Sequence, residues 1–317
     1  MKRSRIAGTG GYLPEKVLSN SNLEQMVDTS DQWILERTGI SNRHIMADHE
    51  TTSSMAENAA RKAFEVAGLN PEDVELILVA TATPDRTFPS TACILQNRLG
   101  AFGCPALDVG AACAGFIYGL SIADQYIKNG VVKNALVIGA ESLSRIVDWT
   151  DRSTCVLFGD GAGAVVLEAT DEPGILSTHI HANGYYNDLL YAGNRIGELK
   201  EPAYIKMQGN EVFKIAVKTL GDIVDETLAY NNIDQSEIDW LIPHQANLRI
   251  ITATAKKLNL PMERVILTVQ DHGNTSAASI PLALDKGVRD KRIKRGEMIL
   301  LEAFGAGLTW GSALIKY

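Results

Sequence analysis

A cysteine, a histidine and an asparagine are the residues of this chain whose types and positions could carry out chemistry. Cys113 lies in the segment 108–119, DVGAACAGFIYG, between a strand predicted over 105–109 and a helix predicted over 116–128. A helix N-terminus offers unpaired N–H groups and positive dipole charge, so we expect Cys113 to favour its thiolate. A lone cysteine is more often a structural residue, so this interpretation depends on what accompanies it.

His244 and Asn274 lie in similar turns in the second half of the chain. His244 follows a predicted buried strand in 240–247, WLIPHQAN, and Asn274 stands in a glycine turn before a predicted helix in 271–281, DHGNTSAASIP. A lone histidine is usually a satisfied polar residue, and an asparagine at a helix start is usually a cap. If both face one pocket, however, they form a pair of hydrogen-bond donors.

Three glycine-rich segments also need an interpretation. Residues 8–14 and 158–163 lack the features of nucleotide-binding loops, and we expect tight turns there that lead into the next strand. The segment 304–311, FGAGLTWG, can in addition offer backbone N–H groups to an oxyanion if it faces the pocket.

Composition limits the classes of function. The chain has 317 residues, 45% of them hydrophobic, and a formal net charge of −8, which argues against broad nucleic-acid or membrane binding. The basic first residues are not followed by an apolar signal segment, and no apolar run is long enough to span a bilayer, so we expect a cytoplasmic protein. The four cysteines lack metal-site spacing.

One local exception to the acidic balance is informative. Arg249, Lys256 and Lys257 fall on one face of a helix predicted over 247–257. This face is either an ordinary solvated surface or a docking site for an acidic partner.

The order of predicted elements indicates an α/β protein made of two related halves. Strands predicted over 76–80, 105–109 and 135–139 alternate with helices predicted over 91–99 and 116–128. Residues 67–77 can be laid over 231–241, and this register places the Cys113 segment over 275–279. We therefore predict an N-terminal half, 1–170, that carries Cys113, and a C-terminal half, 171–317, that carries His244 and Asn274.

Together, the segments around Cys113, His244, Asn274 and 302–311 closely resemble the β-ketoacyl-acyl carrier protein synthase III family over essentially the whole chain. The resemblance implies a five-layered α-β-α-β-α thiolase-like fold, a homodimer, no cofactor, and catalysis by Cys113, His244 and Asn274. One position departs from the family: the usual Gly-Gly-Gly turn has Ala306 in its middle. The backbone N–H of Ala306 can still join that of Cys113 in an oxyanion hole if the turn needs no positive φ there.

The resemblance also implies the substrates and their contacts. Cys113 would take an acyl group, most simply from acetyl-CoA, and malonyl-acyl carrier protein would then lose CO₂ and attack it to give acetoacetyl-acyl carrier protein. The residues that match the CoA site and tunnel are Trp33, Arg37, Arg152, Leu189, Met207, Asn210, Phe213, Asn247 and Phe304. Phe88 matches the residue that closes the acyl pocket of the partner subunit, and Lys214, Arg249, Lys256 and Lys257 match the surface for the carrier protein.

Two other interpretations stay open at the level of sequence. Hydroxymethylglutaryl-CoA synthases and chalcone-type synthases use the same three residue types, but in longer chains. A catalytically inactive scaffold or acyl-binding protein would not need all three side chains.

Overall fold

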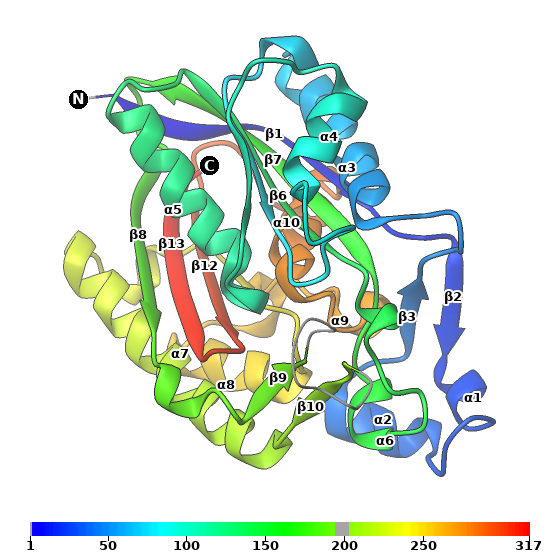
Figure 1. Ribbon diagram of the computed structural model, residues 1–317. Helices are drawn as coiled ribbons and strands as arrows, with labels where there is room; N and C mark the ends of the chain where they lie inside the picture. The colour runs from blue at the N-terminus through cyan, green and yellow to red at the C-terminus, as the bar shows by residue number, and fades with distance from the viewer. Residues whose placement is uncertain (1, 194–202) are drawn as a thin grey trace.

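Two large β-sheets, with helices between and outside them, form the body of the computed structural model of the protein, which describes residues 2–193 and 203–317 (Figure 1). The first sheet has the strand order β1-β7-β6-β4-β5 and the second the order β11-β12-β13-β8. The strands are β1 (Arg3–Tyr12), β4 (Ile77–Ala80), β5 (Ala106–Val109), β6 (Asn134–Glu141), β7 (Gly161–Thr170), β8 (Ile175–Ala182), β11 (Trp240–Pro243), β12 (Met298–Gly305) and β13 (Thr309–Lys316).

The helices separate and cover these sheets in five layers. Two helices lie between the sheets, because α5 (Gly115–Lys128) contacts β4, β6, β8 and β13, and α10 (Ser279–Arg289) contacts β1, β7 and β11. The outer layers are α3 (Thr52–Ala67) with α4 (Thr91–Leu99), and α7 (Gly209–Asn231) with α8 (Leu248–Lys257). This arrangement confirms the predicted α-β-α-β-α fold.

Smaller elements border the second sheet and the site. They are β2 (Lys16–Ser19), α1 (Asn20–Leu23), α2 (Asp31–Thr38), β3 (Asn42–Ile45), α6 (Arg152–Cys155), β9 (Leu190–Ala192), β10 (Ile205–Met207) and α9 (Val269–His272). Two smaller two-stranded sheets pair β2 with β3 and β9 with β10. In the part of the chain that the structure describes, every helix is too short or too polar to cross a membrane.

The two halves repeat one pattern of strand directions. β4 is parallel to β6 and β6 antiparallel to β7, just as β11 is parallel to β12 and β12 antiparallel to β13. The turns before α5 and α10 each contain a non-glycine residue with positive φ, Ala112 at 45° and Ser276 at 49°. These correspondences support a duplicated unit, while the boundary near residue 170 stays a prediction.

The tight turn predicted in the segment 8–14 begins later than expected, because β1 continues to Tyr12 and only residues 13–15 connect it to β2. Residues 8–12 lie inside β1, where Gly8 and Gly10 face α3, which crosses the strand at close range. A Cβ on Gly8 would stand 2.2 Å from the carbonyl oxygen of Ala63, and one on Gly10 would stand 2.2 Å from that of Ala59. Since such a distance is a steric clash, the glycines permit close packing of helix on sheet.

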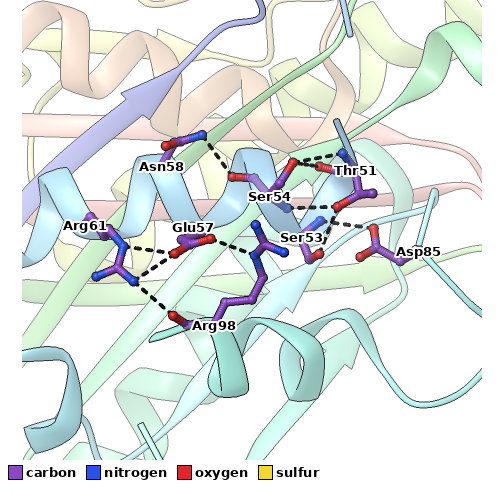
Figure 2. Close-up of polar contacts among 8 residues, drawn as sticks. All are labelled: Thr51, Ser53, Ser54, Glu57, Asn58, Arg61, Asp85 and Arg98. Atoms are coloured by element: carbon purple, nitrogen blue, oxygen red, sulfur yellow. Dashed lines mark hydrogen bonds and ion pairs between the residues drawn. The ribbon is translucent and has the colours of Figure 1, made fainter. Parts of the chain in front are cut away.

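Polar side chains fix the start of α3 and the loop that follows β4. The Thr51 side chain accepts a hydrogen bond from the Ser54 N–H, and the Ser54 side chain accepts one from the Thr51 N–H, which is a reciprocal capping box. Figure 2 shows the neighbouring Ser53 N–H donating to Asp85, at 3.0 Å. This bond anchors the loop that carries Phe88.

Glu57 joins α3 to α4 through two arginines (Figure 2). Its carboxylate accepts from Arg61 at 2.8 Å and from Arg98, on α4, at 2.7 Å. Partial burial alone would raise the pKa of Glu57, but the hydrogen bonds from Arg61 and Arg98 outweigh it and lower the pKa. The network therefore favours the ionised carboxylate.

Candidate active site

Cys113, His244 and Asn274 line one cavity of about 260 Å³. Each side chain comes from a turn at the end of a different element. Cys113 lies at the start of α5, His244 directly follows β11, and Asn274 precedes the short turn 276–278 that leads into α10. All three are buried, so the cavity brings together the residues that the sequence singled out.

The environment of Cys113 differs from the expectation that its thiolate is favoured. Burial raises the pKa of Cys113 to about 12, a hydrogen bond with Ser276 lowers it only in part, and the nearby Glu141 carboxylate raises it further. The backbone N–H at the helix start also favours the thiolate, but its effect is smaller than that of burial. In the free protein, Cys113 is therefore a thiol that must lose a proton to react.

The glycine turn after β12 packs directly against the backbone of Cys113. A Cβ on Gly305 would stand 2.7 Å from the Cys113 nitrogen, so only glycine allows this approach. The Thr309 hydroxyl lies 2.9 Å from the carbonyl oxygen of Ala111 and 3.1 Å from that of Ala306, and it links the two segments. Gly307, not Ala306, takes the positive φ of this turn, at 128°. Ala306 therefore needs no positive φ, which was the condition for its N–H to join the oxyanion hole.

A serine on α10 determines which nitrogen of His244 carries its proton. The Ser279 oxygen accepts from the Gln245 N–H at 3.3 Å and lies 2.7 Å from His244 Nδ1. Because one contact uses Ser279 as an acceptor, the arrangement that satisfies all groups has its hydroxyl donating to Nδ1. Nε2 then carries the proton. Burial lowers the pKa of His244 to about 3, so the ring is neutral and acts as a donor.

Asn274 is held so that its amide nitrogen is left for the cavity. Its side-chain oxygen accepts from the Ser276 N–H at 2.9 Å. Its backbone is fixed to the neighbouring segment by bonds with the Leu157 carbonyl, at 2.8 Å, and the Gly159 N–H, at 3.0 Å. With the oxygen engaged, the NH₂ group is the free end of the amide.

A second, smaller cavity of about 80 Å³ also opens on Cys113. Its lining is almost entirely apolar, apart from the side chains of Cys113, Ser276 and Tyr191. The other lining residues are Ala82, Ala112, Leu143, Ile146, Phe158, Leu190, Ala192, Ile205 and Ala306. Such a space suits a short hydrocarbon chain attached to the cysteine sulfur.

The structure places most of the predicted tunnel residues on the larger cavity. Those that line it are Trp33, Arg37, Met207, Asn210, Phe213, Asn247 and Phe304. Arg249, which was predicted for the carrier-protein surface, lines it as well. Leu189 instead packs in the apolar cluster beside the cavity, and its neighbour Leu190 lines both cavities. Asn247 has a structural task as well, because it caps α8 and donates to the Arg37 carbonyl at 2.9 Å.

Two arginines already stack on the indole ring at the mouth of the cavity. The guanidinium carbon of Arg152 lies 4.9 Å from the centre of the Trp33 ring, and that of Arg37 lies 5.6 Å from it. Arg152 also donates to the Asp28 carbonyl at 2.7 Å. An adenine ring between Trp33 and Arg152 would therefore have to displace the Arg152 guanidinium.

The predicted basic face lies beside this mouth. Arg249, Lys256 and Lys257 on α8 are exposed, as is Lys214 on α7. Lys257 pairs with Asp225 at 2.7 Å and Lys214 with Glu211 at 2.8 Å. The Arg249 guanidinium stacks over the Phe213 ring at 5.0 Å, so this charge lies at the edge of the cavity.

Phe88 is exposed to solvent over 82% of its surface. It precedes Ser90, the N-cap of α4, and the same helix start is held by Asp108 of β5, whose carboxylate accepts from the Thr91 and Ala92 N–H groups at 2.8 Å. A large exposed ring therefore stands near the outer strand of the first sheet.

Comparisons with known proteins agree with this site. The 3-oxoacyl-[acyl-carrier-protein] synthase III family matches residues 107–184, and its C-terminal domain matches residues 228–317. The β-ketoacyl-[acyl-carrier-protein] synthase III of Thioalkalivibrio sulfidiphilus is 63% identical over all of both chains, and that of Methylococcus capsulatus is 63% identical over 99% of each. The chain belongs to this family.

A solved structure of the family has the same fold. The 3-oxoacyl-[acyl-carrier-protein] synthase III of Aquifex aeolicus is 51% identical and superposes with a TM-score of 0.95 over 99% of this chain and 100% of its own. The residues that the sequence did not single out are Glu141, Ser276 and Ser279. Their signal in the sequence is weak because their roles depend on contacts between segments far apart in the chain.

The neutral state of His244 can be tested by NMR of the protein with ¹⁵N-labelled histidine. Because burial lowers its pKa to about 3, we expect its ring signals to show the Nε2–H tautomer unchanged from pH 8 to pH 5.5. The folded state then binds fewer protons at His244 than the unfolded state, so this residue reduces stability as the pH falls below about 6.5. The ring signals that are missing from the spectrum of His244→Gln are assigned to His244. A change in those signals with pH near neutrality would contradict a neutral His244.

Proposed function

We propose that this synthase III joins an acyl group from acyl-CoA to the two-carbon unit of malonyl-acyl carrier protein, in the cytoplasm, with Cys113 as the nucleophile. The observation that carries the proposal is the shared cavity. One buried thiol and two buried donors, His244 and Asn274, face the same space. A smaller apolar cavity beside the thiol is the place for the acyl chain.

In the first half-reaction the sulfur of Cys113 attacks the thioester carbonyl of acyl-CoA. The carbonyl oxygen becomes an oxyanion, which the N–H groups of Cys113 and Ala306 stabilise because both belong to the segments that Thr309 links. CoA leaves as a thiol, and the acyl group stays on Cys113. Trp33, Arg37 and Arg152 hold the nucleotide end of CoA, with Arg152 moving from the indole to admit the adenine.

The second half-reaction needs donors for an enolate but no base. When malonyl-acyl carrier protein loses CO₂, negative charge develops on its thioester oxygen. The Nε2–H of His244 and the NH₂ of Asn274 are neutral donors held by Ser279 and Ser276, so they do not need to reorganise as the charge appears. The carbanion then attacks the acyl group on Cys113, and acetoacetyl-carrier protein leaves when acetyl is the primer.

Separate assays of the two half-reactions test these roles. We expect Cys113→Ala to form no acyl-enzyme but still to decarboxylate malonyl-carrier protein, because the enolate donors are intact. His244→Ala and Asn274→Ala should each lose about 10²–10³ in the decarboxylation rate and still become acylated. Intact-mass analysis after mixing with acetyl-CoA, and release of ¹⁴CO₂, give the two readouts.

Each result can also contradict the proposal. Acylation of Cys113→Ala would place the nucleophile elsewhere, and normal decarboxylation by either donor variant would remove its assigned role. A wild-type protein that binds acyl-CoA without forming an adduct would be an acyl-binding scaffold.

The carrier protein docks on the basic face of α8, beside the mouth of the cavity. Arg249 and Lys256 have exposed charges that no acidic side chain of the described residues pairs, whereas Lys257 is paired with Asp225. Carrier proteins of this pathway are acidic, so the face offers complementary charge next to the tunnel that the malonyl group must enter.

Charge reversal tests this docking surface. We expect Arg249→Glu with Lys256→Glu to lower kcat/KM for malonyl-carrier protein at least tenfold at low salt, and the loss should shrink as salt rises. Lys133→Glu with Lys294→Glu is the control, because it makes the same change in net charge. Both lysines lie shortly before the first residues of β6 and β12, whereas the last residues of these strands lead toward the site. This pair should have little effect on kcat/KM. Equal losses with both pairs of substitutions would show a general charge effect and remove the docking site.

The enzyme is a homodimer in this proposal, with β5 at the interface. This strand is the outer strand of the first sheet, its Leu107 is 40% exposed, and an unpaired edge of this kind favours association. The exposed Phe88 near β5 then enters the acyl pocket of a second copy and limits its length.

Phe88→Thr tests the contribution from the partner. We expect this variant to raise kcat/KM for longer or branched acyl-CoAs relative to acetyl-CoA, while sedimentation equilibrium still shows a dimer. Phe102→Thr removes another exposed ring, at the far end of α4, and should leave the primer profile unchanged. A monomer, or an unchanged profile in Phe88→Thr, would overturn the role of Phe88.

A further inference from the structure

The thiol of Cys113 has no evident route by which to lose its proton. Its burial favours the protonated sulfur, so acylation in the proposed function requires a proton acceptor close to it. We propose that the Glu141 carboxylate takes this proton through the hydroxyl group of Ser276. This inference rests on the proposed function, because it concerns the step in which acyl-CoA acylates Cys113.

His244 is poorly arranged to be that acceptor. Its Nδ1 lies 2.7 Å from the Ser279 hydroxyl, which also accepts from the Gln245 N–H. With Ser279 donating to Nδ1, the other nitrogen carries a proton, and neither nitrogen has a lone pair free for the thiol. The same tautomer is the one that the decarboxylation step needs, so a separate acceptor lets His244 keep a single protonation state through the cycle.

Ser276 connects Cys113 to Glu141. Its side chain lines the smaller cavity together with Cys113, and a hydrogen bond with Ser276 partly offsets the rise that burial causes in the pKa of Cys113. The Ser276 hydroxyl donates to Glu141 Oε1 at 3.0 Å. The Ser276 N–H donates to Asn274, which fixes the backbone of the turn, and Ser276 has a φ of 49°, outside the region that residues other than glycine usually adopt. A strained residue held in this way commonly serves a functional site, and here it places one hydroxyl between two titratable groups.

Glu141 lies at the end of β6 and is completely buried. Besides Ser276, its carboxylate accepts from the hydroxyls of Thr83, at 2.6 Å, and Thr81, at 3.3 Å, and from the Ala82 N–H at 3.1 Å. In the described residues, neither lysine nor arginine hydrogen-bonds it. The titratable group that faces Glu141 across Ser276 is Cys113, and the other partners are neutral hydroxyl and amide groups.

This environment lets Glu141 exist in either protonation state near neutral pH. Burial raises its pKa to about 7, and the hydrogen bonds from Thr83, Ala82, Ser276 and Thr81 oppose a larger rise. A carboxylate with such a pKa is ionised often enough to accept a proton and basic enough to attract one. An ordinary surface carboxylate, with a pKa near 4, would be a weaker base.

The transfer balances over the acylation step. The S–H proton of Cys113 moves to the Ser276 oxygen while the hydroxyl proton of Ser276 moves to Glu141 Oε1. The sulfur forms a bond to the acyl carbon, and collapse of the tetrahedral intermediate breaks the carbon–sulfur bond to CoA. The proton then returns from Glu141 through Ser276 to the departing CoA sulfur, so the products are acyl-Cys113, CoA thiol and an ionised Glu141.

A double-mutant cycle on the acylation rate tests the relay. We expect Glu141→Gln and Ser276→Ala each to slow single-turnover acylation by acetyl-CoA about 10²-fold at pH 7.5. Because the two residues act in series, the double variant should be no slower than the slower single variant. Two independent structural defects would instead multiply.

The pH profile gives a readout that a structural role would not change. Glu141 acts in its ionised form, so the wild-type acylation rate should rise with pH through about 7 and then level off. In Glu141→Gln this inflection should disappear, and the rate should keep rising with pH. Asp160→Asn is the matched control, because Asp160 is also a buried carboxylate and accepts from the Met46 and Ser144 N–H groups away from Cys113. It should keep both the inflection and the rate.

The outcomes separate this inference from the proposed function. A wild-type protein that forms no acyl-enzyme would contradict the proposed function itself. Normal acylation by Ser276→Ala, multiplicative losses in the double variant, or an unchanged inflection in Glu141→Gln would overturn the relay. If Glu141→Gln does not fold, the rate and the pH profile of Ser276→Ala still decide it, because that variant keeps the buried carboxylate but interrupts the path to it.

Discussion

Close packing between the two turns that begin α5 and α10 is the constraint on which the rest of the site depends. The turns 112–114 and 276–278 contact each other, and small residues make up both of them. A Cβ on Gly139 would stand 2.0 Å from the Ala277 carbonyl oxygen, and one on Gly305 would stand 2.7 Å from the Cys113 nitrogen. Because the backbones approach so closely, groups from both halves reach the same few ångströms around the sulfur.

This packing also removes the site from water, and burial disfavours the charged form of each ionisable group there. It raises the pKa values of Cys113 and Glu141 and lowers that of His244, so the neutral forms of the thiol and the imidazole are favoured at rest. Charge then appears only during reaction, on oxygens that meet fixed donors. In such surroundings these donors stabilise an oxyanion far more than they would in water.

The surface around the site is organised differently from its interior. Arginines stack on Trp33 and Phe213 at the mouth, so cations are held over aromatic rings beside the opening. The exposed charges of α8 lie next to this opening, although the whole chain has a net charge of −8. Exposed charges of this kind act on the encounter with a partner and contribute little to folding.

The sequence by itself determined the α/β class and the strands around Cys113 and His244, because local periodicity and turn residues are properties of short segments. It also singled out Cys113, His244 and Asn274, which the structure brings to one cavity. It led to an incorrect expectation for the thiolate of Cys113 and to a turn that begins too early, where β1 still continues, since both depend on what packs against the segment. The Ser279 contact with His244 and the Ser276 contact with Glu141 join residues 35 and 135 positions apart. Only the tertiary structure decides such contacts, because they arise from packing segments that lie far apart in the sequence and not from any pattern within one segment.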